Sequence, residues 1–113
     1  MKNAHRILYK SVRNGTLFCV VIATVEDGRL TVHKVDFLEW DYNRRDGIVE
    51  ASYGFDGENT LKLYNLMQAS TASDFIKKLK LEFGFRTDRN TFIGNLMKFC
   101  EKNNIKNKFN VWY

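Results

Sequence analysis

The sequence contains no proline, although roughly one residue in twenty is proline in an average protein. Proline-rich spacers are therefore excluded, and we expect short regular connections in place of a linker between domains. With 113 residues, the chain is long enough for one hydrophobic core but not for two. We expect residues 1–113 to form a single globular domain.

Long hydrophobic runs are lacking as well. The longest, Leu17 to Ala23, is far shorter than the ~20 apolar residues that a membrane-spanning helix requires. Near the N-terminus, the apolar stretch at residues 7–9 is too short for a signal peptide and is bounded by charged residues. We therefore expect a soluble, cytoplasmic protein that does not bind a membrane.

Side chains that usually carry chemistry are few. The two cysteines, Cys19 and Cys100, lie far apart in apolar surroundings, which indicates buried reduced thiols rather than a metal clip or a redox pair. The two histidines, His5 and His33, have no cysteine or carboxylate at metal-ligand spacing. The acidic residues between positions 41 and 58 match no calcium loop. We therefore assign no catalytic residue, metal or cofactor, although an enzyme of unrecognised type stays open.

Strand patterns occupy the first half of the chain. Asn14-Gly15 is a hairpin signal, because both residues tolerate the positive φ angles that a two-residue turn demands. Between Arg29 and Leu38 the apolar alternation changes phase, which predicts a bulge near His33-Lys34. The expected strands are residues 5–12, 16–25, 29–38 and 48–55, with a closing strand at 108–113.

Helix patterns fill the second half. Asp56 can cap a first helix, and Thr71 with Asp74 resembles a capping box at the start of a second. Gly84 suits a left-handed position after that second helix, and Asn103-Asn104 ends a third. The expected helices are residues 57–68, 72–83 and 88–102.

Strands that segregate from helices along the chain favour a mixed class over a doubly wound parallel sheet. The sequence thus predicts an α+β fold, in which an antiparallel sheet of about five strands carries three helices on one face. The order of elements is β-β-β-β-α-α-α-β.

Charge is distributed unevenly between the two halves. Residues 1–60 hold eight Lys/Arg and nine Asp/Glu, whereas residues 61–113 hold ten and four. The helical half is therefore basic and could meet nucleic-acid phosphates, although a solvated helix face has the same pattern. The nucleic-acid candidates on and before the third helix are Arg86, Arg89, Asn95, Lys98 and Lys102.

Aromatic residues offer a second candidate surface. Those that the helices do not cover can stack bases or anchor a protein interface, where Trp, Tyr and Arg dominate the binding energy. They can equally close the rim of a small core. The protein-interface candidates are Trp40, Tyr42, Arg44, Arg45 and Trp112.

The leading hypothesis is a small non-catalytic binding protein that acts through a protein partner or as a homodimer. It depends on abundant aromatic residues in a chain without a recognisable chemical motif. Nucleic-acid binding through residues 61–113 is the alternative, and an enzyme of unrecognised type is the third.

Overall fold

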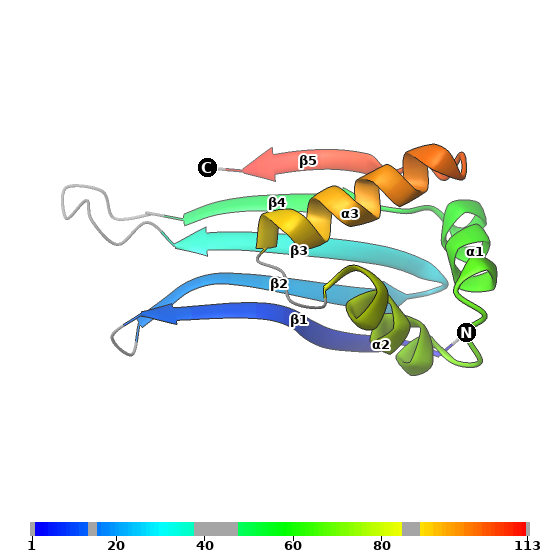
Figure 1. Cartoon of the computed structure of the whole chain (residues 1–113), viewed down its shortest axis with the longest axis horizontal. Coiled ribbons are helices and arrows are strands. Elements are labelled where there is room, and N and C mark those ends of the chain that lie inside the picture. The colour runs from blue at the N-terminus through cyan, green and yellow to red at the C-terminus, as the bar shows by residue number, and fades with distance from the viewer. Residues whose placement is uncertain (1, 14–15, 38–47, 85–88, 113) are drawn as a thin grey trace.

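The structure is a computed structural model that describes residues 2–13, 16–37, 48–84 and 89–112. In these ranges the chain forms five strands and three helices, whose arrangement can be followed in Figure 1. In chain order they are β1 (Ala4–Arg13), β2 (Thr16–Glu26), β3 (Arg29–Phe37), β4 (Ile48–Gly54), α1 (Gly57–Leu66), α2 (Ala72–Phe83), α3 (Arg89–Lys102) and β5 (Lys108–Trp112). Within these ranges, every helix falls short of the length and apolar character needed to cross a membrane.

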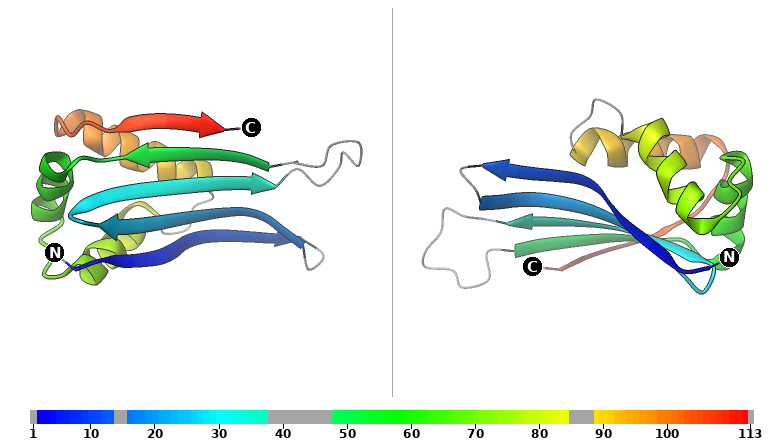
Figure 2. Two further views of the ribbon diagram at one scale, coloured as in Figure 1. Left: turned by 180° about the vertical axis from the view of Figure 1, so that it is seen from behind. Right: turned by 90° about the horizontal axis from the view of Figure 1, so that it is seen from below.

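The strands form one antiparallel sheet in the order β1-β2-β3-β4-β5. Arg13 pairs with Thr16, so β1 and β2 form the predicted hairpin, while Asn14-Gly15 itself lies outside the described residues. All three helices lie on one side of the sheet, which the right-hand view of Figure 2 shows edge-on. The predicted α+β fold and its order of elements are confirmed.

The hydrophobic core lies between the sheet and the helices. Alternate residues of β2 point toward the helices and are buried, as the period of two along a strand requires. These are Cys19, Val21, Ala23 and Val25. The helices supply bulky residues at helical spacing, among them Phe75, Ile76, Leu79, Phe92 and Leu96. Each large side chain that is fully buried contributes about 1.5–3 kcal/mol, so this layer is the main source of stability.

The bulge predicted near His33-Lys34 is wrong, because β3 pairs without a register shift with both of its neighbours. Leu30 and Val32 are buried under the helices, whereas Lys34, the next residue on that face, is only partly buried. The C-terminal end of β3 projects beyond the helices (Figure 1). Lys34 Nζ lies 3.7 Å from Asp36 Oδ2 there. The change of phase in the sequence thus marks the limit of the helical cover and not an irregular strand.

The helix starts follow the predicted capping residues. Asp56 Oδ1 accepts a hydrogen bond from the backbone N–H of Asn59 at 2.8 Å, and Thr71 Oγ1 accepts one from that of Asp74 at 3.0 Å. The Asp74 carboxylate reaches back to the N–H of Ser70 at 3.0 Å, one residue before the cap. These bonds satisfy N–H groups that would otherwise lack a partner at the helix ends.

Gly84 ends α2 in a different way from the prediction. Its φ is −105°, so it is not left-handed. A Cβ atom at this position would lie 2.7 Å from the carbonyl oxygen of Lys80 and 3.2 Å from the ring of Phe92. Glycine is therefore required by the close approach of the Lys80 carbonyl in the last turn of α2 and of the Phe92 ring in α3, and not by a left-handed backbone.

Two other residues adopt left-handed conformations after a helix. They are Gln68 after α1, with φ 54°, and Asn104 after α3, with φ 55°. In the residues that follow, the N–H of Ala69 donates to the carbonyl of Tyr64 at 3.2 Å, and the N–H of Ile105 donates to that of Cys100 at 2.8 Å. Both helix ends thus have the bond pattern of a Schellman motif.

Candidate functional site

Strand β5 forms one outer edge of the sheet, and its five side chains are all exposed. Three of them are large and apolar: Phe109 is 54% exposed, Val111 40% and Trp112 51%. Among the described strands, β5 pairs only with β4. Its outward N–H and C=O groups therefore form a row to which a further strand can bond. We call Lys108–Trp112 the β5 edge.

The side chains of the β5 edge stay exposed, and the most extensive contacts of the helices with the sheet are to β1, β2 and β3. Phe109 packs instead against Tyr53 of β4, with ring centroids 5.0 Å apart. Such aromatic pairs stabilise a fold by about 0.5–1.5 kcal/mol beyond the effect of buried area. Partial burial also raises the pKa of the Tyr53 hydroxyl. Tyr53 pairs with the buried Val32 on one side and with Phe109 on the other, so all three lie on the helical face of the sheet. Val111, two residues after Phe109, lies on the same face.

The open face of the sheet, on the side without helices, carries the other residues of the β5 edge. Asn110 pairs with Ser52, and Trp112 pairs with Glu50. Because side chains alternate along a strand, Lys108, Asn110 and Trp112 all lie on this face. Trp112 is thus an exposed aromatic residue at the rim of the open face.

The opposite edge of the sheet is protected in ways that the β5 edge is not. The register of β1 with β2 shifts at two places along the strand, whereas β4 and β5 pair regularly. β1 also exposes the basic residues Arg6 and Lys10, beside the apolar Ile7, whereas β5 exposes one basic residue, Lys108. Irregular pairing and charged side chains both discourage the addition of a strand. Of the two outer edges, the β5 edge is therefore the better template for another chain.

The start of β5 is held in place by hydrogen bonds to α1. Asn59 Oδ1 accepts from the backbone N–H of Lys106 at 2.8 Å, while Asn59 Nδ2 donates to Asp56 Oδ1 at 2.9 Å. The backbone N–H and the side-chain amide of Asn59 both donate to Asp56 and lower the pKa of its carboxyl group, the backbone N–H contributing most. Ile105 is buried in the core. The β5 edge is therefore anchored at its start and exposed along its length.

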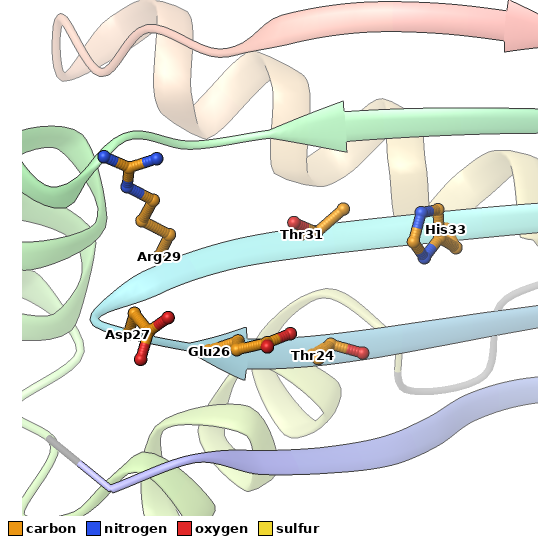
Figure 3. A pocket seen from close by; sticks show the side chains of 6 residues that line it. All are labelled: Thr24, Glu26, Asp27, Arg29, Thr31 and His33. Atoms are coloured by element: carbon orange, nitrogen blue, oxygen red, sulfur yellow. The ribbon is translucent and has the colours of Figure 1, made fainter.

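A shallow hollow of about 520 Å³ lies on the open face beside the β2–β3 hairpin. Figure 3 shows its side chains standing along the two strands, with Arg29 extended toward β4 and away from the acidic groups. The lining residues are Thr24, Glu26, Asp27, Arg29, Thr31 and His33. In the described ranges, no three potential metal ligands come together. The hollow thus offers dispersed polar groups and no convergent set for acid–base chemistry.

A second hollow of about 480 Å³ lies on the helical side, between the ends of α1 and α3 and the middle of α2. Leu66 and Leu81 stand at its rim and are 48% and 60% exposed. Lys78 crosses part of it, because its Nζ donates to the backbone carbonyl of Gln68 at 2.7 Å and lies 3.2 Å from Asp74 Oδ2. This hollow thus combines exposed leucine side chains with the ion pair of Lys78 and Asp74.

The structure describes some of the predicted site residues and not others. Outside the described residues lie Trp40, Tyr42, Arg44, Arg45 and Arg86. Arg89 is the first residue of α3. Asn95, Lys98 and Lys102 are exposed along α3, but Glu101 is exposed beside them, so this face carries both signs of charge.

Phe109 and Val111 were not singled out as contact residues by sequence reasoning. Their alternation predicted the closing strand, and that signal is correct. Whether a strand lies at an edge, and whether a helix covers it, depends on the assembly of the whole sheet. The apolar alternation alone could not identify them as a surface.

Neither cysteine forms a disulfide, and both are buried, as predicted. Burial raises the pKa of the Cys100 thiol to about 11. A thiol with that pKa is protonated at neutral pH and is a poor nucleophile. Cys100 therefore packs as a small apolar side chain.

No protein-family model matches the chain, and no curated protein and no solved structure is significantly similar to it.

Proposed function

We propose that this chain is a small non-catalytic binding protein that engages a protein partner, its own copy included, by strand addition at the β5 edge. The observation that carries the proposal is a regular outer strand with three large apolar side chains exposed. Strand addition joins backbone groups across the edge, and alternate side chains supply specificity. A cytoplasmic location is part of the proposal, because two buried thiols suit a reducing compartment.

Binding of a strand to the β5 edge is energetically favourable. Each backbone hydrogen bond to an added strand contributes about 0.5–1.5 kcal/mol net. Phe109, Val111 and Trp112 add apolar area that is now in contact with water. Aromatic residues at the centre of a contact often dominate its binding energy, and the β5 edge supplies two of them.

The test compares Val111→Lys with a matched control, Leu81→Lys on α2. Both positions are exposed, so neither change buries a charge in the core. A lysine on an edge strand opposes pairing, and we expect Val111→Lys to lose the partner while Leu81→Lys keeps it. Sedimentation velocity over a wide concentration range measures self-association, and a pull-down with the tagged chain measures other partners. Circular dichroism checks that both variants fold. A complex that Val111→Lys leaves intact contradicts the proposal, as does a strict monomer without any partner.

The second candidate function is nucleic-acid binding by α3, favoured by the exposure of Asn95, Lys98 and Lys102 along one side. The +6 balance of residues 61–113, from ten Lys/Arg and four Asp/Glu, adds attraction to phosphates. This candidate requires binding to single- or double-stranded DNA or RNA that weakens steeply as salt rises. Fluorescence anisotropy with labelled oligonucleotides at low salt tests it, and Lys98→Glu should abolish the binding. An anisotropy that stays flat at low salt removes this candidate.

A further inference from the structure

Resting on the proposed function, we infer that the strand added at the β5 edge is β5 of a second copy of this chain. The two five-stranded sheets then join into one continuous antiparallel sheet. A two-fold axis passes through the contact at Asn110, perpendicular to the joined sheet. The register of this contact is determined by the ways in which two identical β5 strands can pair.

Hydrogen bonding restricts the possible registers. Along a strand, the N–H and C=O groups of successive residues point alternately to opposite sides, so every second residue of β5 faces outward. In an antiparallel pair, outward residues must stand opposite outward residues. Two identical strands therefore place helical-face residues opposite helical-face residues. The helices of both copies then lie on the same side of the joined sheet.

Among the allowed registers, the one centred on Asn110 uses the whole β5 edge. It sets Asn110 opposite Asn110 of the second copy, Phe109 opposite Val111, and Lys108 opposite Trp112. A shift in one direction leaves Val111 and Trp112 without an opposite residue in β5. A shift in the other leaves Lys108 and Phe109 without one. The centred register therefore forms more backbone bonds than either neighbour.

The side chains agree with this register on both faces. On the helical face, each exposed Phe109 meets an exposed Val111, and aromatic residues pair well with β-branched residues across strands. On the open face, each Lys108 ammonium meets a Trp112 indole, the ring type that attracts a cation most strongly. No like charges stand opposite each other. The β5 edge is thus complementary to itself in shape, polarity and charge.

Single cysteines introduced along the edge test the register. In the centred register the two Asn110 Cα atoms stand directly opposite, within the roughly 4.4–6.8 Å that a disulfide spans. We expect Asn110→Cys to form a covalent dimer on mild oxidation at least about tenfold faster than Phe109→Cys or Val111→Cys, whose partners are displaced along the strand. Leu81→Cys on α2 controls for random collision. The unmodified chain controls for its own thiols, which are buried.

The outcomes separate this inference from the proposed function. A concentration-dependent dimer that Val111→Lys dissociates, together with fastest cross-linking at Asn110→Cys, supports both. Fastest cross-linking at Phe109→Cys or Val111→Cys overturns the register and leaves the β5 edge as the contact. A monomer that captures a different protein, and loses it with Val111→Lys, overturns the second copy as occupant while the proposed function stands. A dimer that Val111→Lys does not affect overturns both.

Discussion

At the scale of single residues, Asn59 and Thr60 tie the start of α1 to two strands that are distant in sequence. Thr60 is fully buried, and its Oγ1 accepts from the backbone N–H of Leu30 at 2.9 Å and donates to the carbonyl of Phe55 at 3.2 Å. Asn59 makes the corresponding link to Lys106, ahead of β5. A buried polar group stabilises a fold only when its partners are present, so both residues are sensitive positions.

Replacing Thr60 by valine keeps the shape of the side chain and removes the hydroxyl. The buried N–H of Leu30 then has no acceptor from Thr60, and we expect a loss of about 1–3 kcal/mol in the free energy of unfolding. Thr60→Ser keeps the hydroxyl and should lose less. Denaturant unfolding of the three proteins measures the difference. A Thr60→Val protein as stable as the parent would show that the hydroxyl bond contributes nothing.

Asp56 makes the stability depend on pH. Its pKa is lowered, chiefly by the backbone N–H of Asn59, so the folded state favours the carboxylate more than the unfolded state does. The resulting stabilisation is present above the ordinary pKa of an aspartate and is lost as pH falls through the lowered value. We expect Asp56→Ala to be less stable at neutral pH, by an amount that shrinks in acid. Asp56→Asn keeps an acceptor at every pH and serves as the control in thermal melts from pH 2 to 7. A difference that does not change with pH would contradict this account.

At the scale of elements, the helix ends are where local sequence and observed backbone agree least. Asn104 is a residue type that tolerates a left-handed backbone, but Gln68 is not, although both have positive φ angles. The opposite holds for Gly84, which has an ordinary φ but leaves no room for a Cβ atom between the Lys80 carbonyl of α2 and the Phe92 ring of α3. Glycine is thus present where packing demands it and missing where the backbone would favour it.

Gln68→Gly should therefore stabilise the protein. Glycine has no Cβ to oppose a φ of 54°, and the side chain of Gln68 is exposed, so little packing is lost. We expect a gain of about 0.5–1 kcal/mol, after the extra freedom of glycine in the unfolded chain is counted. The control is Lys77→Gly on the exposed side of α2, which should lose about 0.5–1 kcal/mol. Thermal and urea unfolding distinguish the two, and a loss of stability in Gln68→Gly would refute the argument.

At the scale of the whole molecule, the sheet is covered unevenly. The helices make their most extensive contacts with β1, β2 and β3, and α3 also crosses β4 (Figure 1), while the β5 edge carries exposed apolar residues. The core therefore lies under the helices, whereas exposed apolar side chains lie at the β5 edge. The core and the exposed apolar side chains of the β5 edge are thus separated in space, so we expect substitutions at this edge to leave the domain folded.

Amide hydrogen exchange should report this separation. The amides of β2, which pairs on both sides and lines the core, should exchange most slowly. The outward amides of β5 should exchange quickly in dilute solution and slow down as the concentration rises and the edge pairs. The β1 edge is the internal control, and its exchange should not depend on concentration. If β1 and not β5 became protected at high concentration, the contact would lie at the β1 edge and the proposed contact at the β5 edge would be wrong.

The sequence by itself determined the elements, their order and most of the core. Alternation identified β2 and β5, helical spacing identified Phe75 and Leu96, and Asp56 and Thr71 were recognisable as caps, because each signal depends on residues close together in the chain. The tertiary structure alone decided which strands lie at the edges, where the helical cover ends and which apolar residues stay exposed. Those properties depend on contacts between distant segments, so Phe109 looks like a core residue in the sequence and lies on the surface in the fold.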